Sequence, residues 1–197
     1  MERKRESRGV NRRAWTAGEL TAMGLLAAIL SVSAYIVIPL PFTAVSITAQ
    51  TMVVNLIGML LGPAQTAAVI LVWILLGLAG LPVFSGGAGG AGKLFGPTGG
   101  YILGFLVAAV LISLFCRKVK GLGKQTAFLI AVGIPVIYLF GVSWTRYTTG
   151  LPWPALLLRD TLPFIPLDVV KCLAAAALAK ALRRALPGTT NARMNKL

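Results

Sequence analysis

Two charged residues stand in an otherwise apolar stretch near the end of the chain. Asp168 and Lys171 are three positions apart, and Pro166 just before them suits the first turn of a helix. Residues at this spacing share one helix face, so the carboxylate and the ammonium can simply pair, with the acid also stabilised by the helix dipole. Both can instead point into a polar cavity, where Asp168 would accept N–H groups of a ligand and Lys171 would donate to a carbonyl or carboxylate.

A glycine-rich run precedes Tyr101. Residues 85–100 hold eight glycines, and a backbone without Cβ atoms can turn tightly and approach a ligand closely. We predict that this run forms a lid over a ligand and that Tyr101 closes over a bound ring system; a merely flexible loop is the alternative. The glycines predicted to line the site are Gly86, Gly87, Gly89 and Gly90.

The same run contains a misleading nucleotide motif. Residues 87–93 read Gly-x-x-x-x-Gly-Lys, which is how a phosphate-binding loop begins. The next residue is Leu94, where magnesium binding needs Ser or Thr, and the segment before the motif is typical of a membrane helix rather than a buried strand. We therefore expect no nucleotide site.

Composition indicates the class of protein that must position these residues. Hydrophobic residues make up 57% of the chain and charged residues 12%, against about 45–50% and about 25% in soluble domains. A surface this apolar suits lipid, so we predict an all-α integral membrane protein. The net charge is +14, and the basic residues lie between apolar runs. This distribution indicates contact with a membrane surface, and we expect no nucleic-acid partner.

Little in the sequence suggests catalysis. The chain has no histidine, and Cys116 and Cys172 lack the spacing of metal ligands. Asp168 is the one acid well inside an apolar run, which leaves few groups for acid–base chemistry. We expect no enzyme activity, no catalytic residue, no metal site and no cofactor.

Six apolar runs predict a single bundle of about six transmembrane helices in a membrane domain of residues 18–185. The pair Gly62-Pro63 separates the second run from the third and is typical of a helix stop followed by a helix start, so we expect a tight helical hairpin there. The runs are residues 18–38, 47–61, 64–79, 97–115, 126–142 and 162–182.

Lysine and arginine residues predict the orientation, because cytoplasmic loops retain positive charge. Most of the 19 fall in both tails, near the end of the last run and in residues 117–124. Both termini are therefore expected in the cytoplasm, as basic tails at 1–17 and 186–197, and the glycine-rich loop between helices three and four outside. The chain would be a multi-pass protein of the cell membrane. The basic residues expected in outer loops are Lys93, Arg146 and Arg159.

Five blocks of sequence, in this order and at this spacing, resemble the BioY family, the biotin-specific substrate-binding (S) components of energy-coupling-factor (ECF) transporters. The resemblance extends over roughly residues 18–185. The blocks are residues 39–50, Leu61-Gly62-Pro63, Gly80-Leu81-Pro82-Val83-Phe84-Ser85-Gly86-Gly87, Gly96-Pro97-Thr98-Gly99-Gly100-Tyr101 and Asp168-x-x-Lys171.

The resemblance implies a function in vitamin uptake. The protein would bind biotin on the outer face and release it inside when two cytoplasmic ATPases act through a transmembrane coupling subunit, and it would hydrolyse nothing itself. Asp168 and Lys171 would carry the polar contacts, with the glycine loop and Tyr101 closing the pocket. Biotin suits such a site, since its ureido ring and carboxylate need polar partners while its thioether ring and chain need apolar walls.

The chain departs from the family pattern at two places. Leu167 stands where the resemblance leads us to expect a glycine. S components also dock through an Ala-x-x-x-Ala face on the first helix, and here the first run offers only small-x-x-x-small patterns, which still allow close helix approach. We predict that these residues face the coupling subunit; packing within the chain's own bundle is the alternative. They form the patterns Gly24-x-x-x-Ala28 and Ala27-x-x-x-Ser31.

Two other functions remain open on the sequence. One is an S component for another small vitamin, such as thiamine or riboflavin, with the same fold and partners. The other is a stand-alone permease. The sequence contains no ATPase motif, so active transport by this chain would need a partner.

Overall fold

The structure is a computed structural model that describes residues 14–185. The predicted C-terminal tail at 186–197 and residues 1–13 of the predicted N-terminal tail lie outside the described residues. The main helices coincide with the six apolar runs, so the prediction of a mostly helical chain is confirmed. They are α1 (Ala17–Ser33), α2 (Gln50–Leu60), α3 (Pro63–Leu78), α5 (Gly99–Phe115), the continuous helix of α6 (Leu122–Phe128), the π-helical turn η2 (Leu129–Gly133) and α7 (Ile134–Thr149), and α9 (Ile165–Ala185).

Local sequence signals explain several helix ends. The side chains of Thr16 and Glu19 satisfy backbone N–H groups at the start of α1 in a capping box. Pro63 occupies the first turn of α3, where its missing N–H costs nothing. Gly150 ends α7 in the left-handed conformation, at φ +71°, which glycine adopts without strain.

The first run is not helical throughout, contrary to the prediction of a helix over residues 18–38. Helix α1 ends at Ser33, and the next residues form strand β1 (Val37–Ile38), which pairs antiparallel with β2 (Ile47–Thr48). Prolines at 39 and 41 cannot continue a helix, and β-branched residues favour a strand. A short hairpin therefore connects α1 to α2.

The predicted tight hairpin of α2 and α3 is wrong as well. Leu61 and Gly62 both have extended backbones, with ψ near 160°, so the chain opens out between the two helices. Helix α2 packs mainly against α5 and α9 and has few contacts with α3. This arrangement brings α2 beside the helix that carries Asp168.

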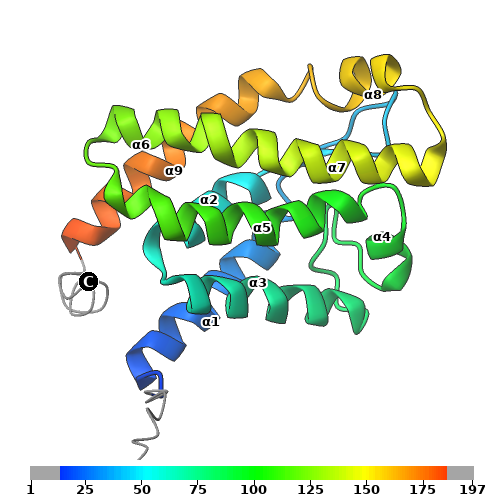
Figure 1. Ribbon diagram of the computed structural model, residues 1–197. Coiled ribbons are helices and arrows are strands. Elements are labelled where there is room, and N and C mark those ends of the chain that lie inside the picture. Colours follow the sequence, from blue (N-terminus) through cyan, green and yellow to red (C-terminus); the bar gives the residue numbers. More distant parts are fainter. Residues whose placement is uncertain (1–13, 186–197) are drawn as a thin grey trace, which may run out of the picture.

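Helix α5 is the centre of the bundle. It packs most closely on α7 and also contacts α2 and α3, and Figure 1 shows α3, α5 and α6–α7 running side by side. Glycines permit the close approach: a Cβ on Gly104 would lie 3.1 Å from the backbone of Ile137. Small residues commonly bring apolar helices together in this way in membranes.

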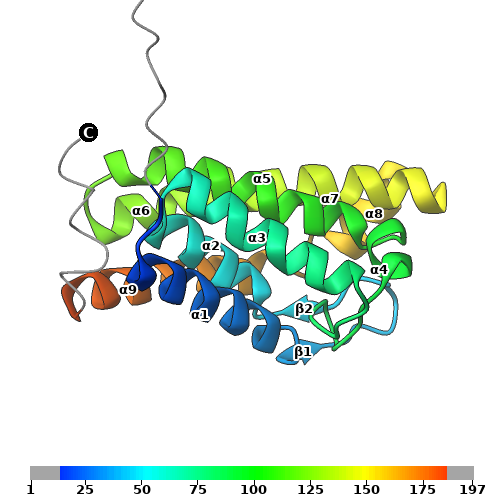
Figure 2. The same cartoon turned by 90° about the horizontal axis from the view of Figure 1, so that it is seen from below.

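The two ends of the bundle differ. The first and last described residues lie at one end, together with the connections from α2 to α3 and from α5 to α6 (Figures 1 and 2). The β1–β2 hairpin, α4 (Ala91–Phe95) and α8 (Trp153–Asp160) lie at the other end. The glycine-rich segment between α3 and α5 thus sits opposite the termini.

The helices are apolar outside as well as inside. Leu25, Val32, Leu75 and Leu139 are all more than 60% exposed, and exposed apolar surface on this scale suits a lipid environment. Within the described residues, one helix, Leu122–Thr149, is long and apolar enough to cross a membrane by itself. Helices α8 and α9 qualify together as a pair bent by 52°, and the four remaining main helices are apolar but shorter.

The packing of α5 on α7 yields a test. A Cβ on Gly100 would lie 2.3 Å from the Phe140 carbonyl oxygen and 2.2 Å from Trp144 Cβ. Gly100→Ala should therefore lower the free energy of unfolding by about 1–3 kcal/mol through overpacking, measured by thermal unfolding of the detergent-purified protein. Gly24→Ala is the control, because nothing lies within 4 Å of that position. Equal stability of the two variants would contradict this packing.

Candidate ligand-binding site

A cavity lies at the end of the bundle opposite the termini. Strand β2, helices α2, α3, α5, α7 and α9, and the segment after α3 all contribute to its wall. The empty space, including its open mouth, is about 610 Å³. Most of the wall is apolar and aromatic. Its large apolar side chains include those of Trp73, Phe84, Phe105, Ile137 and Phe164.

Asp168 lies on this wall in the first turn of α9, with only 7% of its surface exposed. Lys171 Nζ donates to Asp168 Oδ1 at 2.9 Å, and the Tyr138 hydroxyl donates to Oδ2 at 2.6 Å. The Thr51 hydroxyl donates to Oδ1 at 3.3 Å. A buried carboxylate is stable only when donors surround it in this way. Donors from α2, α7 and α9 therefore hold its charge in one orientation.

Asp168 and Lys171 pair with each other and also face the cavity, so the two interpretations of their spacing hold together. Asp168 and Lys171 pair through one face of α9, and both also line the cavity. A carboxylate offers about four acceptor positions and an ammonium three donors, so each retains capacity for a ligand. The structure thus brings both predicted residues together at a polar spot in an apolar pocket.

Tyr101 lines the cavity from α5, as predicted for a pocket residue. Its hydroxyl donates to the backbone oxygen of Asp160 at 3.2 Å, and its ring lies where a Cβ on Gly141 would be, within 2.5 Å. The side chain is only 8% exposed. Tyr101 therefore offers its ring to the cavity while its hydroxyl is engaged elsewhere.

The glycine-rich segment reaches the cavity through other residues than those predicted. Ser85 and Lys93 line the wall. The four predicted glycines shape the segment that carries these two residues, and none of the four is among the lining residues. They are Gly86, Gly87, Gly89 and Gly90.

Close packing explains why glycine stands there. A Cβ on Gly89 would lie 2.5 Å from the Leu81 carbonyl oxygen, so no larger residue fits. Gly86 has φ +75°, and its N–H donates to the Ala34 carbonyl at 3.0 Å, which ties the segment to the end of α1.

Further polar residues anchor the segment at the cavity. Gln50 Nε2 and Trp73 Nε1 both donate to the Val83 carbonyl, at 3.3 and 3.2 Å. The Trp73 ring meets Phe84 edge to face, with centroids 5.1 Å apart. The predicted site residues did not include Trp73, Phe84, Tyr138 and Thr51, because spacing along the chain gives no signal for contacts between distant helices.

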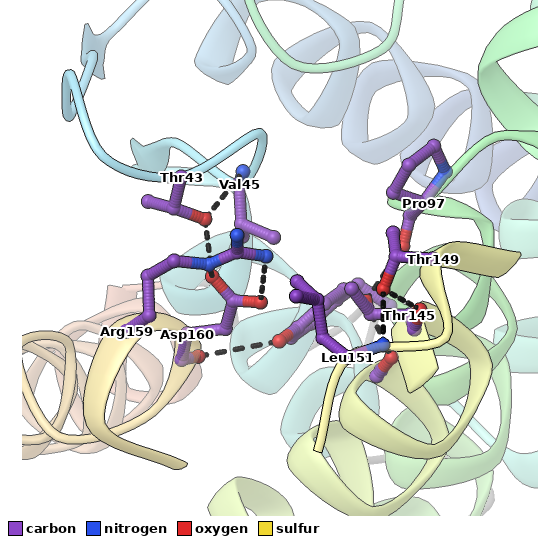
Figure 3. A network of polar contacts seen from close by, with 10 residues as sticks. Thr43, Val45, Pro97, Thr145, Thr149, Leu151, Arg159 and Asp160 are labelled. Carbon is purple, nitrogen blue, oxygen red and sulfur yellow. Dashed lines mark hydrogen bonds and ion pairs between the residues drawn. The ribbon is translucent and has the colours of Figure 1, made fainter. Parts of the chain in front are cut away.

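A second buried charge lies at the same end of the bundle as the cavity (Figure 3). Asp160 is fully buried, and Arg159 donates to both its carboxylate oxygens, at 2.9 and 3.0 Å. The Thr43 hydroxyl also donates to Asp160 Oδ1 and accepts from the Val45 N–H at 3.0 Å. This network fastens the connection between β1 and β2 to α8. Arg159 is one of the basic residues expected in an outer loop, and Asp160 is not among the predicted site residues.

The small residues of α1 divide between two faces. Gly24 and Ala28 are exposed, whereas Ala27 and Ser31 are half-buried, with the Ser31 hydroxyl donating to the Ala27 carbonyl at 2.9 Å. The pattern Gly24-x-x-x-Ala28 is thus the one presented at the surface. Among the described residues, no group of three His, Cys, Asp or Glu side chains gathers as a potential metal site.

A helical bundle with an apolar exterior and a mostly apolar cavity around one ion pair is the architecture expected of a membrane protein that binds a small molecule. The chain belongs to the BioY family, whose model matches residues 5–188. The resemblance read from the sequence blocks is therefore confirmed.

Relatives and a solved structure agree with this assignment. The chain is 35% identical over 170 residues to the biotin transporter BioY2 of Lactococcus lactis, covering 86% of this chain and 92% of the relative. It is 36% identical over 167 residues to a probable biotin transporter BioY of Pyrococcus horikoshii, covering 85% and 97%. A crystal structure of the S-component for biotin from an ECF-type ABC transporter superposes with a TM-score of 0.80 at 28% identity, covering 87% of this chain and 95% of the other.

The Asp160 network predicts a large effect of removing its cation. Arg159→Met leaves a carboxylate that is fully buried without its ionic partner, and breaking a buried pair typically costs about 3–5 kcal/mol. We expect a clearly lower melting temperature in detergent. The double variant Arg159→Met/Asp160→Asn should recover much of the loss, because no unpaired charge remains. A single variant as stable as the parent protein would refute the structural role of this pair.

Proposed function

We propose that this protein takes up biotin as the substrate-binding component of an ECF-type ABC transporter. Membership of the BioY family supports the assignment. The observation that carries it structurally is the Asp168–Lys171 pair, held in the wall of an otherwise aromatic and aliphatic cavity. As such a component the chain is not an enzyme.

The cavity chemistry matches the fused rings of biotin. The ureido ring has two N–H donors and one carbonyl acceptor, and its neighbouring thioether ring is apolar. Asp168 accepts from a ureido N–H, and Lys171 donates to the ureido carbonyl. Trp73, Phe84 and Phe105 supply the apolar wall for the rings.

Tyr138 and Thr51 are positioning residues in this proposal. Each donates to an oxygen of Asp168. A carboxylate has about four acceptor positions, so capacity for a ligand N–H remains. Pre-formed donors reduce the ordering cost of binding, which raises affinity without a further ligand contact. The Tyr101 ring and the segment bearing Ser85 close the pocket.

The chain crosses the cell membrane several times, with both termini in the cytoplasm. The positions of the charges support this orientation, since basic residues in the α5–α6 connection and near the end of α9 share the end of the bundle where the described chain begins and ends. The cavity, at the other end, then faces outward and captures the vitamin from outside the cell.

Transport requires partners, because the sequence has no ATPase motif. A transmembrane coupling subunit and two cytoplasmic ATPases supply the energy. The coupling subunit docks on α1, where the exposed pair Gly24 and Ala28 permits close helix approach.

Ligand titration tests the binding site. Asp168→Asn removes the negative charge of the acceptor and Lys171→Met removes a charged donor, and losing one charge-assisted hydrogen bond should weaken biotin binding about 10- to 100-fold. Calorimetry of the detergent-purified protein measures this, with thiamine and riboflavin as comparison ligands. Binding of biotin alone, weakened in both variants, is the expected result; a folded protein that prefers thiamine or riboflavin contradicts the proposal.

The docking face needs a separate test that leaves the cavity intact. Gly24→Leu and Ala28→Leu place bulky side chains on the exposed face of α1, so we expect both to lose co-purification with the coupling subunit while biotin affinity stays unchanged. Leu139→Ala, at an exposed position on α7, is the control. Normal assembly in both leucine variants would exclude this face.

A further inference from the structure

A second set of contacts repeats the arrangement around Asp168 one helical turn deeper in the bundle. At the cavity, Thr51 on α2 and Tyr138 on α7 both donate to Asp168 on α9. Four residues farther along α2 and α9, and so one turn farther from the cavity, lie Asn55 and Cys172. Asn55 Nδ2 donates to Cys172 Sγ at 3.5 Å. Helices α2 and α9 are therefore joined by polar contacts at two levels.

The third helix reaches the deeper level at its π-helical turn. A Cβ on Gly133, the last residue of η2, would lie 3.2 Å from Asn55 Oδ1, so glycine lets this turn come close to the amide. Pro135 follows directly and has no N–H to donate along the helix, which favours an irregular turn at this point. Asn55 thus lies against both of the other helices whose partners at the cavity level meet at Asp168.

Asn55 contributes little stability at this place. The residue is only 2% exposed, and its Oδ1 has no hydrogen-bond donor among the described residues. Its Nδ2 donates to a sulfur, which is a weak acceptor, so the contact offsets little of the cost of burying the amide. A leucine of similar size would avoid that cost. A buried polar side chain of this kind can instead fix how helices sit against each other.

We propose that Asn55 is a positioning residue for ligand binding, because it fixes the rotation of α2 and α9 beside the π-helical turn and thereby orients Asp168. This role rests on the proposed function, in which Asp168 accepts from the ligand. A rotation of α9 changes the direction of every hydrogen bond at Asp168, and such bonds weaken steeply when they lose alignment. Asn55 is not among the residues that line the cavity, so it acts through Asp168.

Calorimetric titration of the full chain in detergent with biotin tests this role at the ligand. Asn55→Leu should weaken binding about tenfold, at the lower end of what the outer hydrogen-bond partners of metal ligands contribute. Its melting temperature should stay equal to that of the parent protein or rise, because a poorly paired amide is removed. In the Asp168→Asn background, Asn55→Leu should cause no further loss of affinity, because the carboxylate that it positions is gone.

Matched variants separate positioning from mere burial. Thr66→Val is the control, since the Thr66 hydroxyl on α3 is also fully buried without a hydrogen-bond partner among residues 14–185, and biotin affinity should stay unchanged. Cys172→Ser keeps an acceptor for the Asn55 amide and should retain the affinity. Cys172→Ala removes that acceptor and should weaken biotin as Asn55→Leu does.

Thermal unfolding without ligand tests the same role independently of the vitamin. Tyr138→Phe removes a hydrogen bond to the buried carboxylate of Asp168, so it should lower the melting temperature of the parent protein. In the Asn55→Leu background the decrease should be less than half as large, because the hydroxyl and the carboxylate are no longer aligned there.

Three results would overturn the positioning role. They are unchanged biotin affinity in Asn55→Leu, equal effects of Tyr138→Phe in the two backgrounds, and a loss of affinity that comes with a lower melting temperature. The third result would make Asn55 a purely structural residue. A folded parent protein that binds no biotin rejects the proposed ligand instead, and the effects of Tyr138→Phe in the two backgrounds then decide the role of Asn55.

Discussion

One buried carboxylate organises this protein. Asp168 is nearly inaccessible to solvent, and such a charge can exist there only because donors from three helices converge on it. This requirement places the first turn of α9 beside the start of α2 and the first half of α7. Apolar packing can hold helices at many relative positions, whereas donors that share one hydrogen-bond acceptor allow very few relative positions. The ligand cavity is the space left around that fixed point.

Much of this arrangement could be predicted from the sequence, and the reasons for the failures are physical. Apolar runs identify helices because lipid and a helical core impose the same composition, and Asp168 and Lys171 stood out because charge is rare in such runs. Tyr138 and Thr51 could not be found, since their contacts with Asp168 span 30 and 117 residues. The β1–β2 hairpin was missed because Val37 and Ile38 are as apolar as the helix before them.

The glycine-rich segment carries several of its glycines for reasons of packing. Glycine was expected at the ligand, yet Gly89 is needed where the segment passes under the Leu81 carbonyl, and Gly86 where the backbone turns to reach α1. The residues that reach the cavity are the larger neighbours Ser85 and Lys93. In this segment Gly86 and Gly89 allow close contacts of backbone with backbone, and the side chains that line the cavity belong to other residues of the segment.

Asp160 connects the wall of the cavity to the segment between β1 and β2. Its backbone oxygen holds the Tyr101 hydroxyl in the cavity wall, and its carboxylate holds Thr43 in the connection between β1 and β2. Lifting that connection away would therefore remove a hydrogen bond from a buried charge, at the residue that also anchors the Tyr101 ring in the cavity wall. The few contacts that keep this end of the chain folded therefore also hold one wall of the cavity in place.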